Sequence, residues 1–292
     1  MPLLAAAVCP HPPLIVPELA GAAAPELAEL RAACAAAVTD LYATGARTVV
    51  LVGSGGRTTE PGLPCQGSFT PWGLRLSVRL DTWSPAAQER VEAPAGEARA
   101  ESSSGEERVE SPAAQERFDA PDGDGPVGSS GGVDGDRRLP LSLLVGAWLV
   151  DRVAPPTRTA WRMVSVAPDE PADRCAAVGA GLGVDGPWAL LVLGDGSACH
   201  GPKSPGYDDP RAGAYDEGVA RALADADADA LLALDPAVSA QLRVAGRPAW
   251  QVLAGAVHAA GGDWRGDLRH HSAPYGVGYL VASWVRTGGA AR

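Results

Sequence analysis

The sequence is short of the basic residues that a nucleic-acid-binding surface requires. Its 292 residues include 24 Lys and Arg against 35 Asp and Glu, for a net charge of −11 at pH 7. A surface of that sign repels a phosphate backbone, so we expect no nucleic-acid partner. Apolar residues make up 46% of the chain and charged residues 20%. These ordinary values exclude a collagen, or a chain disordered along its whole length.

The sequence also has few cysteines and no long hydrophobic run. The five cysteines are widely spaced and form no CxxC motif, which argues against a disulfide framework and a structural zinc site. The longest apolar run, Leu139–Val150, contains Pro140 and Gly146 and is shorter than the ~20 residues that span a bilayer. Leu3–Cys9 resembles the end of a lipoprotein signal but lacks a basic region before it. We therefore expect a soluble, cytoplasmic protein with no membrane partner.

The negative charge is concentrated in one segment. Ser84–Arg138 holds 13 acidic residues and six Arg, and only five of its residues are apolar other than Ala. It contains a near-duplicate, SPAAQERVEAP at Ser84–Pro94 and SPAAQERFDAP at Ser111–Pro121. Two copies without an apolar face cannot build a repeat fold. We interpret residues 84–138 as a disordered acidic low-complexity insertion within a single domain that spans residues 1–292.

Outside this segment, apolar runs of strand length alternate with helical patterns. Strands are predicted at Leu3–Val8, Arg47–Val52, Leu74–Leu80, Trp161–Val166, Trp188–Leu193, Asp263–His271 and Gly276–Val285. Helices are predicted at Pro25–Thr44, Leu139–Val153, Ala172–Leu182, Ala212–Ala224, Pro236–Val244 and Pro248–Ala260. This alternation indicates an α/β three-layer sandwich, with a mostly parallel central sheet and helices on both faces.

Four of the five histidines lie at or just after strand ends, where ligands bind in open α/β sheets. They are His11, His200, His270 and His271, whereas His258 lies in a helix. Imidazole is both a common ligand for iron and zinc and a general base near neutral pH. Two histidines and a carboxylate would suit Fe(II). None of the histidines has HxH or HxxxH spacing, so each could equally be a satisfied loop residue.

Two loops match known motifs only in part. Gly53–Thr58 follows a strand but lacks the Lys of a phosphate loop, and Pro61 and Pro64 prevent a helix from starting. Gly194–Ala198 follows a strand without the GxSxG spacing of a nucleophile elbow. A hydrolase with Ser197 or Cys199 as nucleophile therefore has no support from the motif spacing and is kept only as an alternative hypothesis.

Three segments, in this order, resemble class III extradiol ring-cleavage dioxygenases of the subunit-B type and their Memo-like relatives. The first is Cys9-Pro10-His11-Pro12-Pro13 after a strand. The second is the strand and loop Leu191–His200, LVLGDGSACH, similar to a family loop that ends in Ser-His. The third, Ser272–Tyr279 (SAPYGVGY), is the most specific, since it is close to a family motif ending Ala-Pro-Phe-Gly-Val-Gly-Tyr.

The resemblance implies Fe(II) held by two histidines and a glutamate, a catecholate substrate, activation of O2 and a further acid–base histidine. His11 matches the first metal ligand, and His200 is the nearest match to the acid–base residue. The second ligand histidine should follow the second strand, but Gly53–Trp72 holds only Glu60 and Cys65 as ligating residues. The carboxylate position falls on Ser272, a poor ligand.

Two interpretations follow from these missing ligands. In one, a rearranged site binds Fe(II) or Zn(II) through His11 and His271, His200 is catalytic, and Asp195 and Tyr275 bind a small aromatic substrate. The protein would then be a metal-dependent oxidoreductase. In the other, the fold binds a ligand or a protein partner without a metal and without catalysis. The resemblance leaves a homo-oligomer open, because relatives of this family often assemble.

Overall fold

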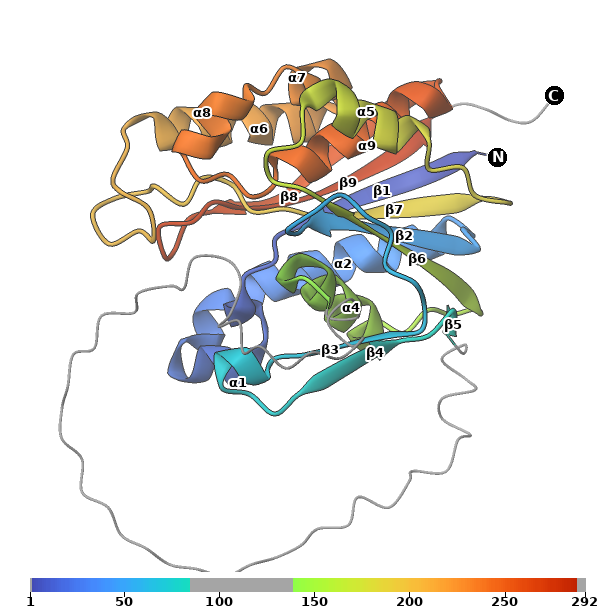
Figure 1. Ribbon diagram of the computed structural model, residues 1–292, viewed down its shortest axis with the longest axis horizontal. Helices are drawn as coiled ribbons and strands as arrows, with labels where there is room; N and C mark the ends of the chain where they lie inside the picture. Colours follow the sequence, from blue (N-terminus) through green and yellow to red (C-terminus); the bar gives the residue numbers. More distant parts are fainter. Residues whose placement is uncertain (1, 85–138, 288–292) are drawn as a thin grey trace, which may run out of the picture.

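The computed structural model describes residues 2–84 and 139–287, which form a seven-stranded main sheet of order β5-β6-β2-β7-β1-β9-β8 (Figure 1). The strands are β1 (Leu3–Cys9), β2 (Thr48–Ser54), β5 (Trp83–Ser84), β6 (Thr159–Val166), β7 (Trp188–Leu193), β8 (Asp263–Ser272) and β9 (Tyr279–Thr287). The predicted acidic insertion, residues 84–138, lies outside the described residues apart from Ser84.

The central strands β6, β2, β7 and β1 are parallel. The flanking strands are antiparallel to their neighbours: β9 to β1, β8 to β9, and β5 to β6. Two reversals make β8 run in the same direction as β1, so its carboxyl end lies at the edge where the central strands also end. The structure confirms the predicted mixed α/β class with a mostly parallel sheet.

One face of the sheet carries α2 (Ala28–Ala43), α4 (Leu141–Arg152) and the small hairpin of β3 (Cys65–Ser68) and β4 (Ser77–Leu80) (Figure 1). The short α1 (Pro17–Ala20) and three 3-10 turns, η1 (Pro13–Ile15), η2 (Gly21–Leu27) and η3 (Thr70–Trp72), complete this side. The apolar side chains of α2 and α4 share one buried cluster with alternate residues of the strands.

The other face is covered by α5 to α9, which share a second buried cluster with the remaining strand residues (Figure 1). Their bounds are α5 (Ala172–Ala180), α6 (Arg211–Asp225), α7 (Ala228–Leu232), α8 (Pro236–Gln241) and α9 (Arg247–Ala260). α5 and α9 approach closely: a Cβ built on Gly179 would lie 2.0 Å from the carbonyl oxygen of Val252, and one on Gly255 would lie 2.2 Å from that of Ala176.

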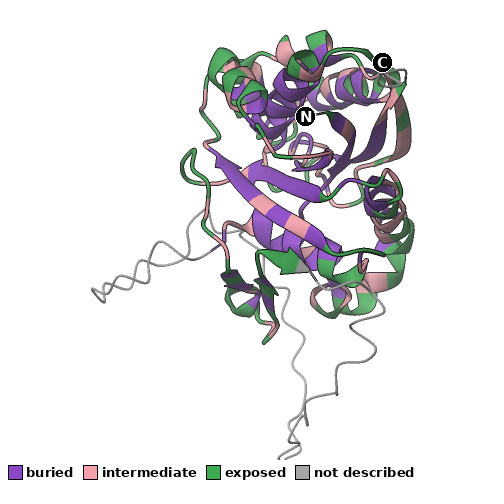
Figure 2. Cartoon of the chain, turned by 90° about the vertical axis from the view of Figure 1, so that its right-hand side faces the viewer, coloured by how far each residue is buried: buried purple, intermediate pink, exposed green. Residues whose placement is uncertain are grey.

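The central strand β7 shows why the strands could be predicted from apolar runs in the sequence. All six of its residues, WALLVL, are buried, because parallel strands covered on both faces are apolar on both sides. Figure 2 shows the same concentration of buried residues along the central strands. None of the helices in residues 2–84 and 139–287 has the length and hydrophobicity needed to span a bilayer.

Candidate functional site

The first two segments of the resemblance meet at the carboxyl edge of the sheet. β1 and β7 are neighbours, with Cys9 opposite Leu193, and the N–H of Gly194 donates to the carbonyl of Cys9 at 3.0 Å. The N–H of His11 donates to Oδ1 of Asp195 at 2.7 Å. The two loops that leave these strands are thus tied together at their first residues.

The third segment is bonded to the second. The N–H of Gly196 donates to the carbonyl of Gly278 at 2.7 Å, and the N–H of Gly278 donates to that of Ser197 at 2.8 Å. The N–H of His200 donates to the carbonyl of Gly276 at 3.1 Å. Three stretches far apart in the sequence therefore form one continuous edge.

The first acid–imidazole pair at this edge is His11 and Asp195. His11 is 6% exposed, and its Nδ1 lies 3.7 Å from Oδ1 of Asp195. This Nδ1 is buried and has no hydrogen-bond partner among the described residues. Burial raises the pKa of Asp195, while the charge and the N–H of His11 oppose that rise. Burial raises the pKa of Tyr279, and the negative charge of Asp195 raises it further.

The second pair is His200 and Asp216, an acid of α6 that the sequence patterns did not single out. The Asp216 side chain is fully buried and lies 2.7 Å from Nε2 of His200 through Oδ2. Its carboxylate also accepts from the N–H of Ser197, at 2.9 and 3.2 Å. Burial raises the pKa of Asp216, and the N–H of Ser197, His200 and the charge of His271 oppose the rise.

Two glycines make room for this carboxylate. A Cβ built on Gly196 would lie 2.7 Å from both oxygens of Asp216, and one built on Gly278 would lie 1.9 Å from Oδ2. Real Cβ atoms do not approach so closely, so side chains at these positions would displace Asp216 or the loops. The Gly-Val-Gly-Tyr motif of the third segment thus has a physical role here, which is to let a buried acid reach the edge.

Asp216 could have been found from the sequence. It lies three residues before Val219 and four after Ala212, within the stripe of α6 that the structure buries. An acid on the apolar stripe of an amphipathic helix needs a partner, since an unpaired buried charge is costly. That position separates Asp216 from the exposed Glu217 beside it.

The two pairs belong to different faces of the sheet. Asp195 influences Tyr279 and Cys34, which lie in the cluster under α2, whereas Asp216 comes from α6 on the opposite face. In the part of the chain that the structure describes, no three His, Cys, Asp or Glu side chains form a group that could hold a metal ion. The structure brings His200 near His271 through Asp216, but it does not assemble His11, His200 and His271.

The remaining predicted residues lie at the same edge. His271 is exposed, while its neighbour His270 has Nε2 2.6 Å from Oγ of Ser272 and a pKa lowered chiefly by burial. The hydroxyl of Tyr275 donates to Oε2 of Glu26 at 2.7 Å. The ligand roles of His11 and His271 and the substrate-binding roles of Asp195 and Tyr275 stay predictions.

The two substitute ligands after the second strand do not point to a metal either. Glu60 accepts from Nη2 of Arg162 at 2.7 Å in an exposed ion pair. Cys65 is buried, and burial raises the pKa of its thiol to about 11, so it is protonated near neutral pH. The loop after β2 begins no helix: the N–H of Gly55 donates to Val166 at 3.0 Å.

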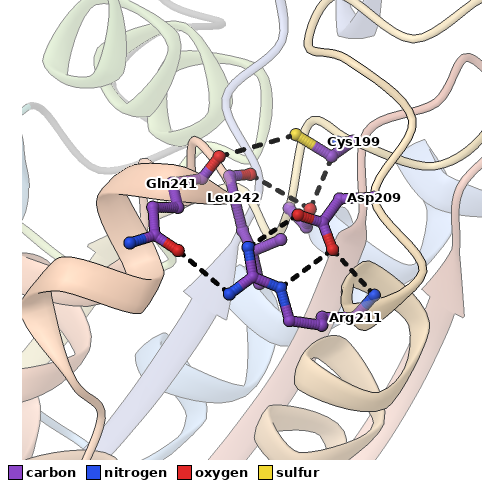
Figure 3. Close-up of polar contacts among 6 residues, drawn as sticks. Cys199, Asp209, Arg211, Gln241 and Leu242 are labelled. Atoms are coloured by element: carbon purple, nitrogen blue, oxygen red, sulfur yellow. Dashed lines mark hydrogen bonds and ion pairs between the residues drawn. The ribbon is translucent and has the colours of Figure 1, made fainter.

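The loop between β7 and α6 is fixed by a polar cluster (Figure 3). Nε and Nη2 of Arg211 donate to Asp209 at 3.0 and 2.7 Å, and Nη1 donates to Oε1 of Gln241 at 2.9 Å. Hydrogen bonds from Arg211 lower the pKa of Asp209 to about 2. Arg211 is therefore engaged within the chain and is a poor choice for an anionic ligand.

The same loop holds the two residues of the hydrolase hypothesis. Ser197 is fully buried and its hydroxyl donates to the carbonyl of Leu242 at 3.0 Å. Cys199 is 2% exposed, its Sγ lies 3.9 Å from the carbonyl of Gln241, and burial raises its pKa (Figure 3). A nucleophile needs access and an activating base, so these contacts argue against both residues.

Comparisons with known proteins identify no family for the chain. No family model matches it, and no curated protein matches it. Among solved structures, it is similar to the uncharacterized protein JW3007 from Escherichia coli K12, at 14% sequence identity and a TM-score of 0.41, over 97% of this chain and 99% of that chain. Similarity at this level supports no inference about function.

The two buried carboxyls predict a pH dependence of stability. Both pKa values are raised in the folded state, so the folded protein holds protons that the unfolded chain has released. The free energy of unfolding therefore falls as pH rises from the usual Asp value of 3.8 towards the raised values. We expect Asp216→Asn to reduce this fall, as measured by urea unfolding between about pH 4 and 8. The exposed Asp225→Asn should keep the wild-type slope; an equal change in both variants would contradict the assignment.

Proposed function

We propose that this chain is an extradiol dioxygenase-like protein that binds a small hydroxylated aromatic molecule at the carboxyl edge of its sheet, with His200 as the acid–base group. One observation carries the proposal. The three segments of the resemblance are joined by hydrogen bonds at this edge. There Nε2 of His200 lies 2.7 Å from the buried carboxylate of Asp216. The proposal includes the three-layer α/β sandwich of that family, which is supported by helices packed against each face of the sheet.

The residues at this edge do not fit the Fe(II) or Zn(II) that the family implies. A non-haem iron site needs two histidines and a carboxylate on one face of the ion. Here His11 lies beside Asp195 and His200 beside Asp216 of α6, and no three donors gather in the described residues. We therefore derive the chemistry of the site from the histidine–aspartate pair alone.

The pair can move a proton at a defined atom. When Asp216 is ionised, its carboxylate only accepts hydrogen bonds, so Nε2 of His200 carries the proton and Nδ1 has the free lone pair. A phenolic hydroxyl placed near Nδ1 could transfer its proton there, which makes the ligand a phenolate. Asp216 would stabilise the imidazolium that forms, as a buried acid does in histidine-based catalysis.

Binding of catechol, followed by calorimetry in a buffer with a metal chelator, tests this function. We expect saturable binding at one site that is at least about tenfold weaker in His200→Ala, which corresponds to the loss of one charge-assisted hydrogen bond. The matched control is His258→Ala, which removes an exposed histidine on α9 and should bind as the wild type does. Absence of saturable binding, or equal binding by His200→Ala, would contradict the proposal.

A second measurement separates binding from oxidation. Oxygen consumption with catechol is followed with and without added Fe(II), in the wild type and in His11→Ala. We expect no consumption above the protein-free control, because the ligand set is incomplete. Consumption that needs Fe(II) and is lost in His11→Ala would replace the metal-free site by the metal-dependent oxidoreductase.

A further inference from the structure

The strand β8 is the last strand of the main sheet in the described residues, and it pairs only with β9. Its ten residues, Asp263–Ser272, make it one of the longer strands. An edge strand presents unpaired N–H and C=O groups, and natural proteins usually cover it or place obstructing charges on it. Within the described residues, the outer edge of β8 therefore offers backbone groups that a further strand could pair with.

The charges of β8 alternate in sign along one face. Asp263, Arg265, Asp267 and Arg269 occupy successive positions of this face, and the first three are exposed. The opposite face, with Trp264 and Leu268, packs on the cluster under α6. A row of charges that alternate in sign is complementary to a reversed copy of itself.

We propose that β8 pairs in antiparallel fashion with β8 of a second copy of this chain, about a two-fold axis at Gly266. In this register Arg265 of each copy lies opposite Asp267 of the other, and Asp263 lies opposite Arg269. Trp264 lies opposite Leu268 on the other face. Opposite charges placed directly across an antiparallel pair stabilise it, and like charges destabilise it.

The alternation selects this register over its neighbours. A two-fold axis at Arg265 places Arg265 against itself and Asp263 against Asp267. An axis at Asp267 places Asp267 against itself and Arg265 against Arg269. Arg269 lies at the bulge of β8 and already bonds with Asp40, Ser283 and Asp267 of its own chain. Its pair with Asp263 therefore adds less than the two central pairs between Arg265 and Asp267.

The neighbouring face of α6 fits the same two-fold axis. A shallow depression of about 260 Å³ lies between α6 and β8, lined by Glu217, Ala220, Arg221, Ala224 and Leu268. The axis stands perpendicular to the sheet, so the two α6 helices lie on the same side. Alanines allow close approach of helices, and Glu217 and Arg221, one turn apart, are complementary to their reversed copies. Strand and helix thus form one self-complementary surface, independent of the ligand site.

Light scattering on the full chain after size-exclusion chromatography tests the proposal. We expect a dimer for the wild type and at least about a tenfold rise in dimer Kd for Arg265→Asp and for Asp267→Arg, since each puts like charges opposite. The double variant with both changes restores opposite charges and should recover the wild-type Kd. Arg174→Asp, an exposed reversal on α5, is the control that should leave the Kd unchanged.

The outcomes are decisive because each variant is also checked for folding by circular dichroism. A wild type that stays monomeric at about 100 μM would overturn the proposal. So would a dimer whose Kd ignores both single reversals, since it must then use another surface. In the supported case, hydrogen exchange should show β8 amides that become protected as the protein concentration rises.

Discussion

Asp216→Ala is expected to lower the free energy of unfolding by about 3 kcal/mol and to abolish ligand binding. The carboxylate is the shared acceptor for the N–H of Ser197 and for Nε2 of His200. Its removal leaves a buried N–H without a partner and frees the imidazole to change its tautomer and orientation. Part of the loss is offset because the cost of burying the carboxyl also disappears.

Matched variants separate these effects. Asp216→Asn keeps an acceptor for the N–H of Ser197, so we expect a smaller loss of about 1 kcal/mol, with ligand binding still reduced. Asp225→Ala, an exposed acid on the same helix, should change stability by less than about 0.5 kcal/mol. Urea unfolding measures all three. If Asp216→Ala were as stable as Asp225→Ala, the buried pair would have no structural role.

Gly255→Ala is expected to cost about 3 kcal/mol, at the upper end of the range for overpacking. The added Cβ would lie 2.2 Å from the carbonyl oxygen of Ala176, which is backbone and cannot rotate away. α9 also packs on the sheet, and its Ala249–Ala254 stretch is buried, so it cannot retreat from α5 without opening the second cluster. Thermal unfolding should show a lower midpoint with an unchanged far-ultraviolet spectrum below the transition.

The same substitution at Gly213 is the control. This glycine lies in α6, and a Cβ built on it meets nothing within 4 Å. Alanine is the better helix former, so Gly213→Ala should stabilise the protein by up to about 0.5 kcal/mol. If Gly255→Ala destabilises the protein and Gly213→Ala stabilises it, the close contact between α5 and α9 is the cause of the loss. If both variants were destabilised, the replacement of glycine by alanine would lower stability without regard to the contact between α5 and α9.

Most of the fold could be predicted from the sequence because its central strands are buried on both sides. Trp188–Leu193 is an uninterrupted apolar run, and it forms a strand with those bounds. The predicted loop Gly53–Trp72 concealed β3, whose four residues, CQGS, include no β-branched side chain. α7 was also missed, because five residues are too few to show a periodicity.

The site was predictable only in part. His11 and His200 follow strands that end at one edge, so their common location could be inferred. The apolar stripe of α6 marks Asp216 as a buried acid that needs a partner, but its pairing with His200 becomes visible only when α6 is placed on the sheet. The sequence also does not show to which face of the sheet each histidine points. The pairing of β8 with β9 shifts by one residue between Leu268 and His270, and such a bulge exchanges the faces of all later side chains.

The position of β1 has a consequence for how the chain is made. β1 is synthesised well before its two neighbours, β7 and β9, with Ala5 opposite both Ala189 and Val285. Contacts between such distant residues slow folding, because a large loop must close before they form. The apolar strand Leu3–Cys9 therefore has no partner strand until β7 and β9 have been synthesised. In that period it is open to aggregation or to binding by a chaperone.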